Sequence, residues 1–178
     1  MSPIHVEPAQ EASLESAEKA GDAGDSLSQQ MAPVLTALKR GLGNTLVAVV
    51  LFGSRARGEA EASSDWDLLV IAHGLPQGAF QRHLHLKQML PLEWRGEVAI
   101  LAKTPEEFES YLTGLFLDVA LDGILLYDSQ SYMAERLARL RRLIQEQGLQ
   151  RRQMGHDLVW DWQHFPGWGW SLDWGMVP

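Results

Sequence analysis

Residues 51–70 have the sequence LFGSRARGEAEASSDWDLLV, and the rest of the chain is organised around this stretch. The apolar run at 46–52 leads into it and predicts a buried strand that ends at the Gly53-Ser54 corner. Backbone N–H groups at a corner where a helix begins can bind phosphate oxygens. The stretch therefore predicts a strand followed by an anion-binding turn.

A pair of carboxylates follows this turn. Asp65 and Asp67 precede the apolar run 68–72, which predicts a second strand. Side chains two apart on a strand point to the same face, so both carboxylates project together while Trp66 points the other way. Two adjacent carboxylates repel one another and are tolerated when a divalent cation lies between them. The pattern is typical of Mg²⁺-dependent phosphoryl or nucleotidyl transfer.

The spacing of these motifs resembles a known signature. Gly53-Ser54, ten intervening residues and then Asp65-x-Asp67 resemble the nucleotidyltransferase superfamily related to DNA polymerase β, in particular its minimal nucleotidyltransferase branch. The residues that also fit the pattern are Arg55, Arg57, Gly58, Ser63 and Ser64. The resemblance extends over about residues 30–150 and implies an α/β (α+β) fold, a small mixed sheet flanked by helices.

The resemblance also implies a chemistry. The expected enzyme transfers an NMP, AMP in the first instance, from an NTP such as ATP to a hydroxyl acceptor with the help of two Mg²⁺ ions. The implied metal ligands are Asp65, Asp67 and Glu97, and the implied nucleotide-binding residues are Gly53, Ser54, Arg55 and Arg57. A solvated surface charge is an equally good interpretation of Arg57.

The third carboxylate departs from the family pattern. Family members usually supply an acid from a strand beside the aspartate pair, and Ala99 is the residue that aligns with it here. Glu97 begins the predicted strand 97–102 and shares a face with Ala99, so it is an alternative source of that carboxylate. The other interpretation of Glu97 is an edge-strand acid without a role. Whether the protein is catalytically competent depends on which of these two interpretations of Glu97 is correct.

The family acts on antibiotics, protein side chains and RNA ends. Small stand-alone members resemble the antitoxin half of a toxin–antitoxin pair and add AMP to a HEPN-domain ribonuclease, so a HEPN-domain protein is an expected partner. A second hypothesis is a nucleotide-sensing or partner-binding module that keeps the fold without turnover.

Composition excludes several other classes. The 178 residues carry a net charge of −8, which argues against a protein that coats nucleic acid by neutralising phosphates. The chain has no Cys, so it forms no disulfide or thiolate metal site. An apolar signal region and an apolar run of membrane-spanning length are both absent from the sequence, so we expect a cytoplasmic protein that binds no membrane.

Three regions are expected along the chain. Residues 1–25 are polar and predict a mobile extension. Residues 26–150 predict the nucleotidyltransferase domain. Residues 151–178 predict a Trp-rich tail that packs on this domain, on a second copy in a homo-oligomer or on a partner, or that stacks as a lid on a nucleobase.

Helical patterns follow the carboxylate pair. Residues 79–90 predict one helix, and Thr104-Pro-Glu-Glu107 predicts a capping box that opens a second helix ending before Gly123. A short strand at 124–127 leads to a final helix, which Asp128 or Ser129 caps. The predicted buried stripe of that helix is Met133, Leu137, Leu140 and Ile144.

Overall fold

The computed structural model describes residues 24–155, 157–164, 167 and 174. The chain divides into two compact units, Met1–Pro33 and Val34–Pro178. In the first unit, residues 24–30 are helical and Met31 forms a turn. The predicted mobile extension, residues 1–25, lies outside the described residues except for its last two.

A four-stranded mixed sheet forms the centre of the second unit. Its strands are β1 (Leu46–Phe52), β2 (Trp66–Ala72), β3 (Val98–Lys103) and β4 (Ile124–Asp128), in the order β3-β2-β1-β4. β1 runs antiparallel to β2 and β4, whereas β2 and β3 are parallel. The small mixed sheet expected from the sequence is confirmed.

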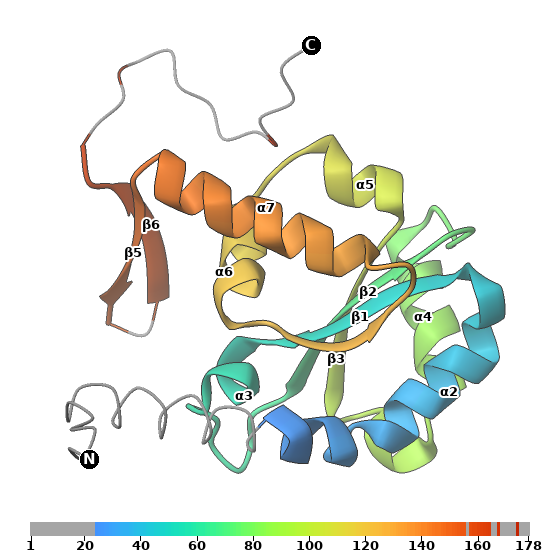
Figure 1. Cartoon of the computed structure of the whole chain (residues 1–178). Coiled ribbons are helices and arrows are strands. Elements are labelled where there is room, and N and C mark those ends of the chain that lie inside the picture. Colours follow the sequence, from blue (N-terminus) through green and yellow to red (C-terminus); the bar gives the residue numbers. More distant parts are fainter. Residues whose placement is uncertain (1–23, 156, 165–166, 168–173, 175–178) are drawn as a thin grey trace, which may run out of the picture. The chain divides into compact units, whose positions relative to one another are not determined.

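Helices cover both faces of this sheet (Figure 1). One face carries α5 (Pro105–Ser110), α6 (Gly114–Asp122) and α7 (Tyr132–Glu146), and the other carries α2 (Ala32–Leu42) and α4 (Ala79–Met89). A five-residue helix, α3 (Gly53–Arg57), connects β1 to the loop before β2, and two 3-10 turns lie at Gly43–Thr45 and Leu92–Trp94.

The larger core lies between the sheet and α5, α6 and α7. Leu69 and Ile71 of β2 contribute to it, and side chains alternate along a strand, so Asp67 points to the same face. The predicted stripe of α7 is confirmed, since Met133, Leu137, Leu140 and Ile144 are the buried residues of that helix. The first residues of α7 are capped by the Asp128 carboxylate, which accepts from the backbone N–H groups of Met133 and Ala134, each at 2.9 Å.

The prediction of one helix between Thr104 and Gly123 is wrong. The capping box is present, because the Thr104 hydroxyl accepts from Glu107 N and Glu107 accepts from Thr104 N. The chain then leaves the helical conformation at Tyr111 and re-enters it after Thr113, which is extended. A β-branched residue followed by glycine is a weak helix former, and the break lets Leu112 reach the core. Helical spacing alone does not reveal such a break.

The Trp-rich tail begins with a β-hairpin. β5 (Leu149–Met154) pairs antiparallel with β6 (Asp157–Trp162), so the expected boundary at residue 150/151 falls inside β5. Trp160 and Trp162 pack against the core from the same strand face. The Trp160 Nε1 donates to Asp118 at 3.0 Å, and Arg151 forms ion pairs with Asp118 and Asp122. The hairpin is thus fastened to α6. Trp168 and Trp170 lie outside the described residues.

None of the helices in the described ranges combines the length and the apolar character that crossing a bilayer requires.

Candidate active site

The two aspartates lie at the start of β2, where the sequence predicted them. Asp65 immediately precedes the strand and is exposed, and Asp67 is its second residue and is partly buried. Trp66 between them is buried and points to the opposite face of the sheet. Asp67 therefore points to the face that also carries α6 and α7, and Asp65 precedes the strand, two residues before Asp67.

The electrostatics of Asp67 indicate that these carboxylates are close. The pKa of Asp67 is raised, first by burial and then by the negative charge of Asp65, while the positive charge of Arg57 acts in the opposite direction. A half-buried acid next to a second acid is a position that a bound cation would stabilise.

Gly53 brings the turn before α3 up to the Asp67 carboxylate. Its φ of +76° lies in the left-handed region, and a Cβ built on it would lie 3.1 Å from Asp67 Cγ and closer still to Oδ2. Residues other than glycine would therefore push the carboxylate away. The turn ends at Gly58, which has a φ of +73° and open space around it. Glycine is thus required at position 53 because the backbone closely approaches the Asp67 carboxylate. At position 58 it is required only because φ is positive.

Ser54 follows Gly53 in the first turn of α3. Its backbone carbonyl accepts from Gly58 N and Glu59 N, which closes the turn. The Ser54 hydroxyl is partly exposed and forms no hydrogen bond within the described ranges. Its partial exposure and its free hydrogen-bonding capacity within the described ranges leave the Ser54 hydroxyl accessible to a phosphate oxygen.

Arg55 has structural partners that the sequence analysis missed. Its Nε and Nη2 donate to the Ser64 carbonyl at 3.0 and 2.6 Å, and its guanidinium stacks on the Trp66 ring at 4.3 Å. Trp66 in turn makes an edge-on contact with Trp94, with ring centroids 5.9 Å apart. These contacts lie on the Trp66 side of the sheet and fix the loop that carries Asp65. Trp66, the aromatic residue between the two aspartates, is the feature of the sequence from which these contacts of Arg55 could have been predicted.

Arg57 is the cation next to the carboxylate pair. Its Nε donates to Glu59 Oε2 at 2.7 Å, in an ion pair in which 22% of the Arg57 side chain and 59% of the Glu59 side chain is exposed. Surface ion pairs of this kind contribute little to stability, so Arg57 can exchange Glu59 for another anion at small cost.

Glu97 lies on the segment next to the aspartates, and its carbonyl accepts a hydrogen bond from Trp66 N at 2.8 Å. Glu97 is exposed and lies in the turn before β3, which begins at Val98 rather than at Glu97 as the sequence predicted. Across the described ranges there is no group of three or more Asp, Glu, His or Cys residues placed to hold a metal ion. The residue paired with Asp67 on β3 is Ala99. A ligand role for Glu97 stays a prediction.

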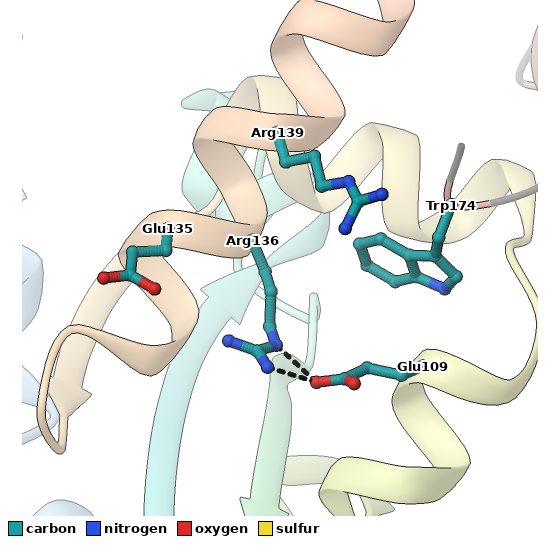
Figure 2. A pocket seen from close by; sticks show the side chains of 5 residues that line it. All are labelled: Glu109, Glu135, Arg136, Arg139 and Trp174. Atoms are coloured by element: carbon teal, nitrogen blue, oxygen red, sulfur yellow. Dashed lines mark hydrogen bonds and ion pairs between the residues drawn. The ribbon is translucent and has the colours of Figure 1, made fainter. Parts of the chain in front are cut away.

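Two hollows lie elsewhere on the unit. One, of about 250 Å³, is lined by Glu109, Glu135, Arg136, Arg139 and Trp174. Figure 2 shows Arg139 pointing toward the Trp174 ring and Arg136 held by Glu109. The other, of about 370 Å³, lies between α4 and β3 beside the ion pair of Arg82 and Glu107. Neither hollow is lined by Asp65 or Asp67.

The residues present fit a divalent cation of the Mg²⁺ type. Asp65 and Asp67 offer only oxygen ligands, which is the donor set that Mg²⁺ prefers. The close approach of Gly53 fixes the Asp67 carboxylate on one side. Asp65 and Asp67 would hold the ion, and Gly53 and Ser54 would face the phosphates of a nucleotide next to it. A mixed α/β domain with this corner and this acid pair defines a nucleotidyl-transfer class of protein.

Comparison with known proteins identifies the family. Residues 42–131 match the family described as "Polymerase beta, Nucleotidyltransferase". The chain is 31% identical over 110 residues to "Putative protein adenylyltransferase MJ1305" of Methanocaldococcus jannaschii, covering 60% of this chain and 75% of that protein. The chain therefore belongs to the polymerase β nucleotidyltransferase family.

Solved structures with lower similarity were also found. A crystal structure of a toxin-antitoxin with AMP-PNP is 21% identical, with a TM-score of 0.46, and covers 65% of this chain and 90% of that chain. A structure of tri-AMPylated Shewanella oneidensis HEPN toxin in complex with MNT antitoxin is 17% identical, with a TM-score of 0.40, and covers 72% and 92%.

Proposed function

We propose that this protein is a Mg²⁺-dependent adenylyltransferase that moves AMP from ATP to a hydroxyl group of another protein. The observation that carries the proposal is the Asp67 carboxylate, which lies against the Gly53 turn and within the electrostatic influence of Asp65. The choice of AMP and of a protein acceptor is supported by the relative described as a protein adenylyltransferase.

The chain's own residues have distinct tasks in this reaction. Gly53 and Ser54 bind phosphate oxygens, and Arg57 leaves Glu59 to neutralise the triphosphate. Arg55 holds the loop in place through the Ser64 carbonyl. Bound Mg²⁺ supplies charge stabilisation on the phosphates and lowers the pKa of the acceptor hydroxyl. The acceptor hydroxyl loses its proton to solvent and its oxygen bonds to the α-phosphorus. The bond between the α-phosphorus and the bridging oxygen breaks, and pyrophosphate leaves with that oxygen.

The partner expected from the sequence is a HEPN-domain protein. The test mixes the chain with Mg²⁺, ATP and the product of an adjacent gene, and measures the intact mass of each component. We expect a gain of one or more AMP masses on the partner, a smaller gain with GTP, CTP or UTP, and none with Asp67→Asn. Glu61→Gln is the matched control, because it removes an exposed carboxylate from the loop that precedes β2.

A second candidate is a nucleotide-binding module without turnover. The presence of Ala99 beside Asp67, where a third acid would stand, favours it. This candidate predicts that ATP binds but that no component gains mass and no pyrophosphate is released with any partner.

A further inference from the structure

β3 is an edge strand of the four-stranded sheet, and half of its backbone groups point away from β2. In the sheet that the described residues form, β3 has a partner strand on one side only. Trp66 N of β2 donates to Glu97 O, which directs the odd-numbered residues of this segment toward β2. Successive residues of a strand bond on opposite sides, so the N–H and C=O groups of Val98, Ile100 and Ala102 point outward.

Side chains of α4 close both ends of this outward row. Arg82 Nη1 donates to Ala102 O at 3.0 Å, and Lys87 Nζ donates to Val98 O. Ile100 lies between these two residues, and its outward C=O has no hydrogen-bond partner within the part of the chain that the structure describes. Cationic side chains on an edge strand limit extended pairing with other chains. One short stretch around Ile100 therefore stays open to a pairing strand.

The hollow of about 370 Å³ beside α4 lies at this stretch. Ile100, Ala102 and Lys103 line it from β3, and His83 and Leu86 line it from α4. Leu86 is buried and apolar, so the hollow combines an apolar wall with open backbone groups. An extended peptide uses both, since its backbone pairs with the edge and its alternate side chains enter the hollow. We call this surface the β3 groove.

The charges along the β3 groove are mainly positive, in a chain whose net charge is −8. Arg82, Lys87 and Lys103 lie along it, and Glu107 is the one acid among the described residues that line it. Glu107 accepts from Arg82 at 2.6 and 2.9 Å, so these two charges compensate each other. The Lys103 ammonium contacts the Tyr111 hydroxyl at 3.4 Å and forms no ion pair within the described ranges. The surplus positive charge favours an acidic partner.

We propose that the β3 groove binds an extended acidic segment of a partner protein, which pairs with the backbone of Ile100. A carboxylate of this segment lies at the Lys103 end, because the exposed Glu97 precedes β3 at the other end and repels acids there. The groove is on the α4 side of the sheet, whereas Asp67 points to the face of α6 and α7. The inference therefore goes beyond the proposed function and does not depend on it.

The experiment measures peptide binding to the full chain by fluorescence anisotropy. The probe is a labelled hexapeptide that alternates valine with aspartate. A second peptide has lysine in place of each aspartate, and a third keeps the aspartates but is methylated on every backbone nitrogen, so that it cannot donate to the Ile100 carbonyl. We expect the first peptide to bind with a Kd below about 1 mM and at least tenfold more tightly than the other two.

Two lysine variants test the position of the bound peptide. Lys103→Gln should weaken binding of the acidic peptide at least threefold, because it removes the unpaired charge of the groove. Lys39→Gln on α2 is the matched control and should leave binding unchanged. Both lysines lie over a tyrosine ring, at 5.7 and 4.4 Å respectively, so each variant loses the same kind of contact within the chain. In the isotopically labelled wild type, the acidic peptide should shift the NMR signal of the Ile100 amide and slow its hydrogen exchange.

Each contrary result overturns the inference. These results are no binding of the acidic peptide, equal binding of the lysine peptide or of the methylated peptide, equal effects of the two lysine variants, and an Ile100 amide that does not respond. Circular dichroism checks that both variants are folded. Asp67→Asn should bind the acidic peptide as the wild type does, so a failure of AMP transfer leaves this test unaffected.

Discussion

The backbone of Gly53 occupies the space beside the Asp67 carboxylate that a side chain would otherwise fill. The two residues are fourteen positions apart, and the antiparallel pairing of β1 with β2 brings them together, since Phe52 is the register partner of Asp67. A turn suited to phosphate is thereby held against an acid suited to a metal.

This relationship predicts the effect of Gly53→Ala. The substitution costs about 1–2 kcal/mol of backbone strain and also displaces the Asp67 carboxylate. We expect transfer activity to fall about a hundredfold, since a shift of about 1 Å in a reacting group has an effect of that order. Gly58→Ala is the control, because it meets a similar φ in open space. It should lower the stability by a similar amount and keep most of the activity. Equal losses of activity in the two variants would contradict this account.

A second prediction concerns stability without metal. Because the pKa of Asp67 is raised in the folded state, the folded protein holds this proton more tightly than the unfolded chain does. The ionised group therefore costs stability at neutral pH, and the cost disappears as the pH falls below the ordinary Asp value of about 3.8. Asp67→Asn should raise the free energy of unfolding at pH 7 by up to about 1 kcal/mol.

Urea unfolding at pH 7 and near pH 3 measures this difference. The increase in the free energy of unfolding caused by Asp67→Asn should be present at pH 7 and absent near pH 3. The control Glu61→Gln should cause no increase at either pH. Added Mg²⁺ with nucleotide should stabilise the wild type and leave Asp67→Asn unchanged. A variant less stable than the wild type at pH 7 in the absence of metal would argue against a strained acid pair.

Arg55 and Arg57 should respond differently to replacement by lysine. Lysine at 55 loses the paired hydrogen bonds to the Ser64 carbonyl and the stacking on Trp66, so we expect a loss of about 2 kcal/mol in unfolding free energy. Lysine at 57 loses only an exposed ion pair and should change stability by less than about 0.5 kcal/mol. The affinity for an ATP analogue, measured by calorimetry, should show the opposite order: Arg57→Lys should lower it more than Arg55→Lys does. A larger affinity loss for Arg55→Lys would contradict this order and would support the nucleotide-binding role that the sequence predicts for Arg55.

The capping box of α5 predicts a separate acid sensitivity. The hydrogen bond from Arg82 is the main cause that lowers the pKa of Glu107 to about 2. A lowered pKa contributes stability above the ordinary Glu value of 4.5, and this contribution is lost as the pH falls from 4.5 to about 2. Since 40% of the Glu107 side chain is exposed, we expect Glu107→Gln to cost about 1 kcal/mol at pH 7.

Urea unfolding between pH 7 and pH 2 tests this sensitivity. The difference between wild type and Glu107→Gln should shrink over the acid range, whereas Glu146→Gln, an exposed acid of α7, should show little effect throughout. A difference that stays constant down to pH 2 would exclude the ion pair as its source.

Much of this architecture could be predicted from local chemistry. The capping box at Thr104, the four-residue stripe of α7 and the alternation around Asp67 depend on neighbours in sequence, and the structure confirms them. The paired tryptophans of β6 also follow from period-two spacing. Such features need no knowledge of which strands pair.

Long-range placement could not be predicted in the same way. The break between α5 and α6 is decided by the core that Leu112 enters, and helical periodicity continues across it. The contact of Arg55 with Trp66 depends on the path of the loop between them. Likewise, the register that pairs Ala99 with Asp67 and leaves Glu97 in a turn is a property of the assembled sheet.

The central claim is that Asp65 and Asp67 together hold a divalent cation next to the phosphates of a nucleotide. Its most direct test is anomalous X-ray scattering from crystals grown with Mn²⁺ and a non-hydrolysable ATP analogue. We predict an anomalous peak about 2.1 Å from a carboxylate oxygen of each aspartate, with the analogue's phosphates between that peak and Ser54. A nucleotide bound with its metal elsewhere, or aspartates that hold no ion when nucleotide is present, would contradict the account.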